Sequence, residues 1–253
     1  MHAIDLNSDL GESFGAYTLG MDEKLMEYIT SANVACGWHA GDPLVMQKTI
    51  RAAAKNGVAV GAHPGYPDLM GFGRREIKIT PEEAYTYVLY QLGALDAFAR
   101  TEGVKIQHVK PHGALYNMAG KDYELARAVC EAIADVNPRL ILMAQAGSQM
   151  QKAAEEMHLK MAREIFADRA YEEDGSLVAR NKPGAMITDE NEAIERVITM
   201  VRQGKVAAIT GKEIPIQADS VCVHGDGEKA LLFVKKLREA FLTEGIQVRS
   251  LTI

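Results

Sequence analysis

Short runs of β-branched and apolar residues alternate with helical stretches along the whole chain, and this alternation limits the fold more than any other feature. It is typical of an α/β protein with parallel strands, because each helix carries the chain back to the start of the next strand. Seven runs are expected to form strands: 4–9, 31–36, 58–63, 106–110, 140–144, 160–165 and 220–224.

Helix boundaries are marked by capping residues. Asp42 precedes a proline and an apolar stripe that ends at Gly57, and Thr80 is followed by Pro81 and by Glu83, which can bond back to the cap. Further helices are expected at 122–136, 149–157, 189–203 and 228–244, a hairpin within 206–217 and a last strand within 246–253.

No low-complexity linker or change of composition divides the chain, so we expect a single β/α domain over residues 1–253. Two connections, 64–79 and 166–189, are longer than usual and rich in Gly, Asp and Arg. Long ordered loops often carry binding residues, although surplus surface is the alternative.

Composition excludes several classes of partner. Lys and Arg number 28 against 34 Asp and Glu, a net charge of −6, and no basic run is present, so nucleic acid is not an expected partner. No apolar stretch approaches the roughly 18 residues that a membrane span needs. The first residues form neither the charged nor the apolar region of a signal peptide, so none is expected. The three cysteines are widely spaced without a CxxC motif, which favours reduced thiols and a cytoplasmic protein.

Polar side chains gather directly after the expected strands. They are Asn7, Asp9 and Glu12, Cys36 and His39, His63, Lys110 and His112, Asp168 and Arg169, and His224 and Asp226. In a parallel β/α barrel all the C-terminal strand ends open onto one face, whereas an open doubly wound sheet brings together only those near its switch point. The pattern favours a barrel with its site at that face. His108 begins its strand and is expected to be structural.

The motifs of several large enzyme classes are absent. The chain contains no GxxxxGK[ST], no GxGxxG after the first strand, no GxSxG and no HExxH. What remains is a set of carboxylates and imidazoles that can move protons, with Lys110 and Arg169 to hold a carboxylate or an oxyanion. This inventory suits a small anionic substrate.

Six blocks of sequence, in their order and spacing, resemble the LamB/YcsF family, which supplies the A subunit of the bacterial ATP-dependent 5-oxoprolinase. They are 5–15, 33–42, 61–68, 109–117, 167–171 and 223–226. The resemblance implies a seven-stranded parallel β/α barrel similar to that of the polysaccharide deacetylases. It also implies ATP-coupled opening of 5-oxo-L-proline to L-glutamate together with two partner subunits, with ATP and magnesium entering through the complex.

Side-chain chemistry suggests a division of roles within that reaction. Asp9, His39, His63 and His112 are predicted to handle protons, and Lys110, Asp168 and Arg169 to position the substrate and stabilise charge. Because the resemblance implies activation by ATP, no metal is expected on this chain.

Two alternatives remain open. A metal-dependent deacetylase or amidohydrolase would bind its ion through Asp9, His39 and His63. A non-catalytic component of a complex would only shape its partners, but the many ionisable groups at one face would then have no explanation.

Overall fold

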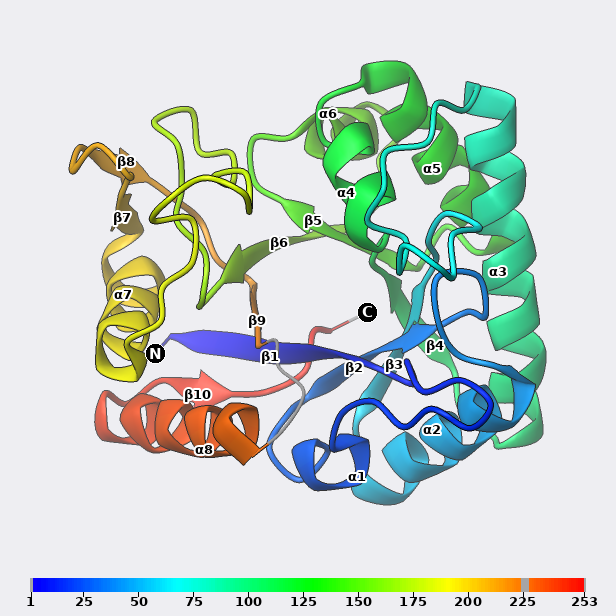
Figure 1. Ribbon diagram of the computed structural model, residues 1–253, viewed down its shortest axis with the longest axis horizontal. Helices are drawn as coiled ribbons and strands as arrows, with labels where there is room; N and C mark the ends of the chain where they lie inside the picture. The colour runs from blue at the N-terminus through cyan, green and yellow to red at the C-terminus, as the bar shows by residue number, and fades with distance from the viewer. Residues whose placement is uncertain (1, 224–227, 253) are drawn as a thin grey trace.

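Seven parallel strands close into a barrel in the computed structural model, which describes residues 2–223 and 228–252 (Figure 1). The strands are β1 (Ala3–Leu10), β2 (Ser31–Ala35), β3 (Ala59–His63), β4 (Ile106–Val109), β5 (Ile141–Gln145), β6 (Met161–Phe166) and β9 (Ser220–Cys222). Neighbours in the chain pair in turn, and β9 closes the ring by pairing with both β6 and β1. The predicted seven-stranded parallel barrel is confirmed.

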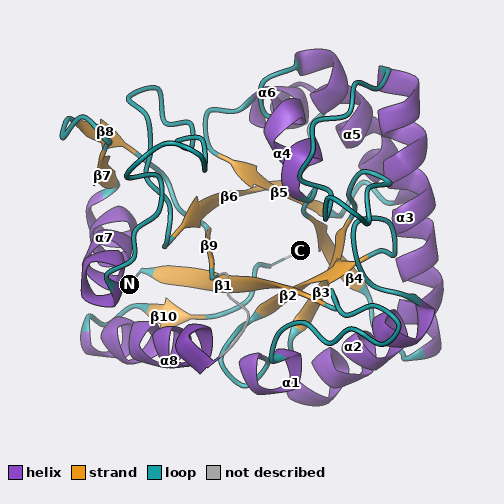
Figure 2. Ribbon diagram, viewed as in Figure 1, coloured by secondary structure: helices purple, strands orange, loops and turns teal. Residues whose placement is uncertain are grey.

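Helices surround the strands and link one to the next (Figure 2). They are α1 (Asp22–Leu25), α2 (Pro43–Asn56), α3 (Pro81–Thr101), α4 (Gly113–Ala119), α5 (Tyr123–Val136), α6 (Gln149–Glu156), α7 (Glu190–Gln203) and α8 (Glu228–Thr243). The predicted caps are confirmed: the Asp42 side chain accepts two backbone N–H bonds at the start of α2, and Thr80 and Glu83 form a capping box at the start of α3. The short helices α1 and α4 were not predicted.

The barrel has a polar interior and an apolar outer layer. In β1, Ile4 and Leu6 are buried in the hydrophobic core, whereas Asn7 bonds to the hydroxyl of Ser220 and to the amide of Asn33. Successive residues of a strand face opposite sides, so the polar set of β1 faces the barrel axis and the apolar set packs outward. This pattern places Asp9 inside the barrel near the C-terminal end of its strand.

Two smaller elements lie outside the barrel. The hairpin predicted within 206–217 is confirmed as the antiparallel pair β7 (Lys205–Ala207) and β8 (Glu213–Pro215). The last strand is only β10 (Gln247–Val248), which pairs with the start of β1. In the described part of the chain, no helix has the length and apolar character needed to cross a membrane. That residues 1–253 form one domain stays a prediction, which limited proteolysis can test.

Candidate functional site at the C-terminal ends of the strands

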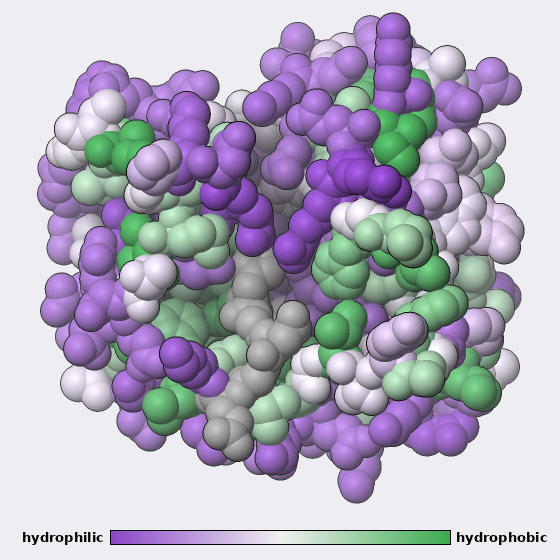
Figure 3. Space-filling model, viewed as in Figure 1, coloured by the Kyte–Doolittle hydropathy of each residue, from purple (hydrophilic) through white to green (hydrophobic). Residues whose placement is uncertain are grey.

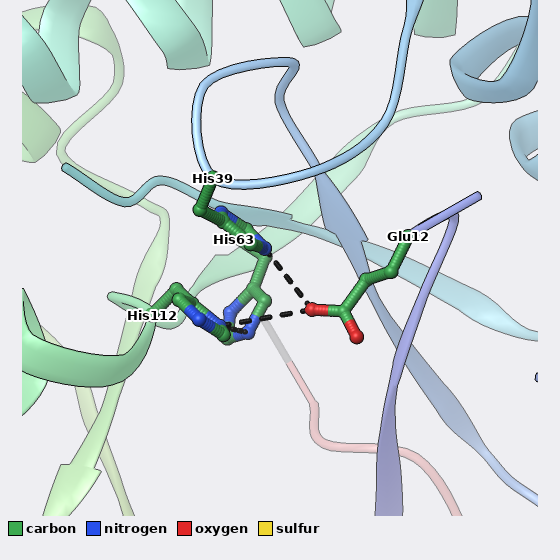
Figure 4. Close-up of side chains that lie close together, drawn as sticks. All are labelled: Glu12, His39, His63 and His112. Atoms are coloured by element: carbon green, nitrogen blue, oxygen red, sulfur yellow. Dashed lines mark hydrogen bonds and ion pairs between the residues drawn. The ribbon is translucent and has the colours of Figure 1, made fainter. Parts of the chain in front are cut away.

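Four side chains from different strand ends point toward one another (Figure 4). Glu12 follows β1, His39 follows β2, His63 ends β3 and His112 follows β4. Each offers one potential ligand atom, and these atoms lie within 4.8 Å of one another. We call these four residues the histidine cluster. The barrel therefore brings together three of the histidines that the sequence predicted at its C-terminal face.

Local backbone structure holds the cluster in place. The long connection 64–79 folds over it, and the backbone N–H of Ala114 donates to the carbonyl of Gly73 at 2.9 Å. Gly73 has a φ of 63°, and an added Cβ would lie 2.7 Å from the Cβ of His39 and 2.8 Å from Cδ2 of His112. Only glycine permits both this conformation and this close approach. The connection therefore lies at the cluster, and its functional role stays a prediction.

The imidazole rings meet in two different ways. His39 and His112 are stacked, with ring centroids 3.6 Å apart and planes within 1° of parallel. His63 and His112 are nearly perpendicular, and Nε2 of His63 lies 2.9 Å from Nδ1 of His112. The carboxylate of Glu12 reaches both stacked rings, with Oε1 at 3.0 Å from Nε2 of His39 and 3.7 Å from Nδ1 of His112.

Backbone carbonyls fix which nitrogen carries the hydrogen in two of these rings. Nδ1 of His63 lies 2.7 Å from the carbonyl oxygen of Lys110, and Nε2 of His112 lies 2.8 Å from that of Phe72. A carbonyl oxygen only accepts hydrogen bonds, so both nitrogens must be donors. Burial, reinforced by the neighbouring imidazoles, holds the pKa of His112 well below its ordinary value. A neutral His112 therefore turns an unprotonated Nδ1 toward His63.

Lys110 forms a second, adjoining centre. Its ammonium lies 2.9 Å from Oδ1 of Asp9 and 2.7 Å from Oε1 of Glu164, a residue of β6. Burial lowers the pKa of Lys110, but the Asp9 and Glu164 carboxylates outweigh it and hold that pKa well above its ordinary value. Asp9 links the two centres, because its Oδ2 lies 3.3 Å from Nε2 of His63. The ammonium is thus already balanced by protein carboxylates.

A chain of hydrogen bonds supports Asp9 from within the barrel. The amide of Asn33 donates to Oδ1 of Asp9 at 2.8 Å, and Nε2 of His108 lies 2.7 Å from Oδ1 of Asn33. Burial, and then the charge of Lys110, lowers the pKa of His108 to about 3. His108 does not line the cavity at the barrel mouth. Its position fits the structural role expected from the sequence.

A cavity of about 770 Å³ opens beside these centres. Asp9, His63, Lys110 and His112 line it, together with the guanidinium groups of Arg74, Arg169 and Arg180. The hollow near the centre of the face in Figure 3 is bordered by hydrophilic side chains. The volume of about 770 Å³ is within the range of small-molecule sites.

Three arginines, Arg74, Arg169 and Arg180, bring positive charge to this cavity. Among residues 2–223 and 228–252, none of them forms an ion pair with a carboxylate within 4 Å. Arg169 is 6% exposed, its Nη2 donates to the carbonyl of Val178 at 2.6 Å, and its Nε has no partner. Burial and then the charge of Arg180 lower the pKa of Arg169. An anionic ligand would relieve this repulsion.

The predicted site residues do not all share the cavity. Asp9, His63, Lys110, His112 and Arg169 line it, and His39 lies fully buried behind His112. Asp168 lines a separate hollow of about 260 Å³ beside α7 and α8. His224 and Asp226 lie outside the described residues.

Several residues of the site were not assigned to it from the sequence. Glu12 was counted among the carboxylates that can move protons but not among the predicted catalytic residues. Arg74 and Arg180 lie in the two long connections, whose length and composition were the available signal. Glu164 stands inside a strand that is otherwise largely apolar, and a carboxylate in that position is itself unusual.

Comparison with known proteins identifies the relatives of this barrel. The model of the LamB/YcsF family matches residues 4–253. This chain belongs to the LamB/YcsF family. Similar members include a protein from Clostridium beijerinckii that is named as the A subunit of 5-oxoprolinase, 63% identical over 98% of this chain and 97% of that one. A protein of the same name from Pyrococcus abyssi is 60% identical over 97% and 96% of the two chains.

Solved structures agree with this membership. The crystal structure of a lactam utilization protein from Thermus thermophilus matches the LamB/YcsF barrel with a TM-score of 0.94 and 45% identity, over 98% of this chain and all of that one. A family 4 carbohydrate esterase from Streptomyces lividans matches with a TM-score of 0.53 and 10% identity, over 99% of this chain and 93% of the esterase. The second likeness shows a shared fold alone.

Proposed function

We propose that this chain is the A subunit of an ATP-dependent 5-oxoprolinase and that it hydrolyses the lactam of 5-oxo-L-proline to give L-glutamate. The observation that carries the proposal is the cavity, which is lined both by arginines that form no ion pair with a described carboxylate and by the carboxylate of Asp9 and the imidazoles of His63 and His112. The relatives are named for 5-oxoprolinase, and that name specifies a small anionic lactam that fits this combination.

The chemistry requires activation, because a five-membered lactam is a resonance-stabilised amide that closes readily. Transfer of a phosphoryl group from ATP to the carbonyl oxygen makes the carbon electrophilic. One water then adds to that carbon and the C–N bond breaks, which leaves an acyl phosphate. A second water releases phosphate, so the products are L-glutamate, ADP and phosphate.

The residues of the cavity suit both halves of this reaction. Asp9 and His63, 3.3 Å apart, can take a proton from water and return one to the ring nitrogen as it leaves. Arg169, with Arg74 and Arg180, can hold the substrate carboxylate and the phosphoryl oxygens through charge-assisted hydrogen bonds. Lys110 acts mainly by fixing Asp9, because its ammonium is already ion-paired. Asp168, beside Arg169 in sequence, would support the loop rather than touch the substrate.

The proposed function includes partners. The sequence carries no phosphate-binding motif, so ATP and its magnesium would bind in a complex with two other subunits in the cytoplasm. The barrel would then be the place where the activated lactam meets water.

Reconstitution tests this proposal. The purified chain with ATP, magnesium and 5-oxo-L-proline should release no phosphate above background, and addition of the two partner subunits should give equal amounts of glutamate and phosphate. Glutamate formation by the chain alone would contradict the division of work. Absence of turnover in the complete complex would contradict the function itself.

A pair of variants separates a catalytic barrel from one that only shapes its partners. In the complete complex, His63→Ala should lower turnover at least roughly a hundredfold, as expected for loss of an acid or base group. His158→Asn, an exposed change at a residue with a φ of 53° that asparagine tolerates, should leave turnover unchanged. Full activity of a folded His63→Ala/His112→Ala variant would favour the non-catalytic alternative.

A further inference from the structure

We propose that the histidine cluster holds one divalent transition-metal ion, bound by His63, His112, Asp9 and Glu12, with His39 in a supporting position. The proposal goes beyond the proposed function and does not depend on it, although an ion at this position would occupy the Asp9 and His63 atoms that exchange protons in the metal-free chain, so that these two residues would then serve as its ligands. It also departs from the sequence, which led us to expect no metal on this chain.

The first observation is a conflict between two nitrogens. Nδ1 of His63 and Nε2 of His112 each donate to a backbone carbonyl, so in neutral rings the opposite nitrogens both carry lone pairs. Those two nitrogens face each other at 2.9 Å. Lone pairs at this distance repel unless a proton or a metal ion lies between or beside them. Outward N–H bonds to carbonyls with inward lone pairs are the arrangement that metal-bound histidines adopt.

Ring orientation decides which histidines can share the ion. A metal bound by an imidazole lies close to the plane of the ring, along the lone pair of its nitrogen. The planes of His63 and His112 are 89° apart and can meet at one point. The planes of His39 and His112 are parallel at a centroid separation of 3.6 Å, so one ion cannot lie in both. His39 is therefore assigned to a supporting position.

Carboxylates complete the site. Oδ2 of Asp9 is 3.3 Å from Nε2 of His63, and Oε1 of Glu12 is 3.7 Å from Nδ1 of His112. A tetrahedral ion with bonds of about 2.0–2.1 Å places neighbouring ligand atoms about 3.3 Å apart, close to these separations. Nε2 of His39 lies 3.0 Å from the same oxygen of Glu12 and can orient that carboxylate by donating to it.

The kinds of ligand atom indicate the class of ion. Two imidazoles and two carboxylates favour zinc or a similar transition metal over magnesium or calcium, which prefer oxygen ligands alone. Such an ion polarises a bound water or carbonyl oxygen when present.

Zinc binding to the isolated full chain tests the site. The chain is purified without an affinity tag, stripped with a chelator and titrated with Zn²⁺ by calorimetry. We expect one ion per chain, at least a hundredfold weaker binding in His63→Ala and in His112→Ala, and a ten- to hundredfold loss in His39→Asn, because His39 acts through Glu12. The control His158→Asn should bind as tightly as the unmodified chain.

Absence of saturable binding at one ion per chain, or binding that survives both His63→Ala and His112→Ala, would overturn the proposal. If either variant fails to fold by circular dichroism, X-ray absorption of the zinc-loaded unmodified chain decides. Two imidazole ligands are expected there, and three would refute the position assigned to His39. These measurements need neither ATP nor partners, so absence of zinc binding leaves the proposed function standing. If a zinc-loaded chain gives no turnover in the reconstituted complex, that result refutes the proposed function and leaves the metal site standing.

Discussion

Removal of the Lys110 ammonium should destabilise the barrel by an amount that depends on pH. The side chain of Lys110 is 3% exposed and lies between the carboxylates of Asp9 and Glu164. The side chain of Glu164 is fully buried, whereas that of Asp9 is 14% exposed. The substitution Lys110→Met keeps an unbranched side chain of similar length but leaves Glu164 without its cation. Breaking a buried ion pair in this way typically costs about 3 to 5 kcal/mol.

Proton uptake limits the part of this cost that comes from the unpaired charge of Glu164. A buried carboxylate that has lost its partner can become neutral, and at pH 7 neutralising a glutamate costs about 3.7 kcal/mol, since each pH unit above its ordinary pKa of about 4.3 costs about 1.4 kcal/mol. The folded variant then carries one more proton than its unfolded state at neutral pH. The loss should therefore shrink as the pH falls, from about 4 kcal/mol at pH 7 to about 1 kcal/mol at pH 5.

Urea unfolding followed by circular dichroism at pH 7 and pH 5 measures this difference, with the unmodified chain at the same pH as reference. Lys105→Met, at an exposed lysine just before the same strand, should change stability by no more than about 0.5 kcal/mol. Glu164→Gln added to Lys110→Met should recover at least half of the loss at pH 7. Equal losses at both pH values, or a loss under about 1 kcal/mol at pH 7, would refute this account of Glu164.

Two further predictions concern the barrel interior. Gly61→Ala should destabilise the chain by about 3 kcal/mol or more, because the new Cβ would overlap the ring of His108. Urea unfolding measures the loss, and adding His108→Ala to Gly61→Ala should restore part of the stability. An unchanged urea midpoint in Gly61→Ala alone would contradict the close approach. Between pH 6.5 and 3 the folded chain keeps His108 neutral while the unfolded chain protonates it, so stability should fall as pH drops below 6.5, by about 2 kcal/mol at pH 5. Urea midpoints at pH 7, 6 and 5 test this dependence. His108→Asn should flatten the change of stability with pH. If that change of stability is the same in His108→Asn, it belongs to other groups.

The sequence predicted the barrel because its strongest signals are local. Apolar runs, capping residues such as Asp42 and Thr80, and the glycines that end helices are all read within a few positions. The convergence of His39, His63 and His112 followed from one topological rule, that parallel strands of a barrel end at one face. Once the alternation of strands and helices is recognised, that rule places residues far apart in sequence at one face.

The remaining features of the site depend on distances that no local pattern contains. Glu164 reaches Lys110 across the barrel, and a charged residue within a strand gives no sign of which distant strand it will face. Arg180 belongs to a connection whose path over the cavity is set by tertiary contacts. Asp168 and Arg169 are adjacent in sequence, yet they line different hollows, so proximity along the chain was a poor guide.

The connection 64–79 couples the two halves of the site. Phe72 adopts a φ of 54°, a conformation that side chains other than glycine and asparagine rarely take, and in it the carbonyl of Phe72 accepts from Nε2 of His112. The guanidinium of Arg74 lies 5.1 Å from the centre of the Phe72 ring and lines the cavity. The segment that fixes the tautomer of His112 therefore also places the guanidinium of Arg74 at the cavity. A displacement that moves Phe72 and Arg74 together would therefore alter both the lone pair that His112 turns toward His63 and the charge at the cavity.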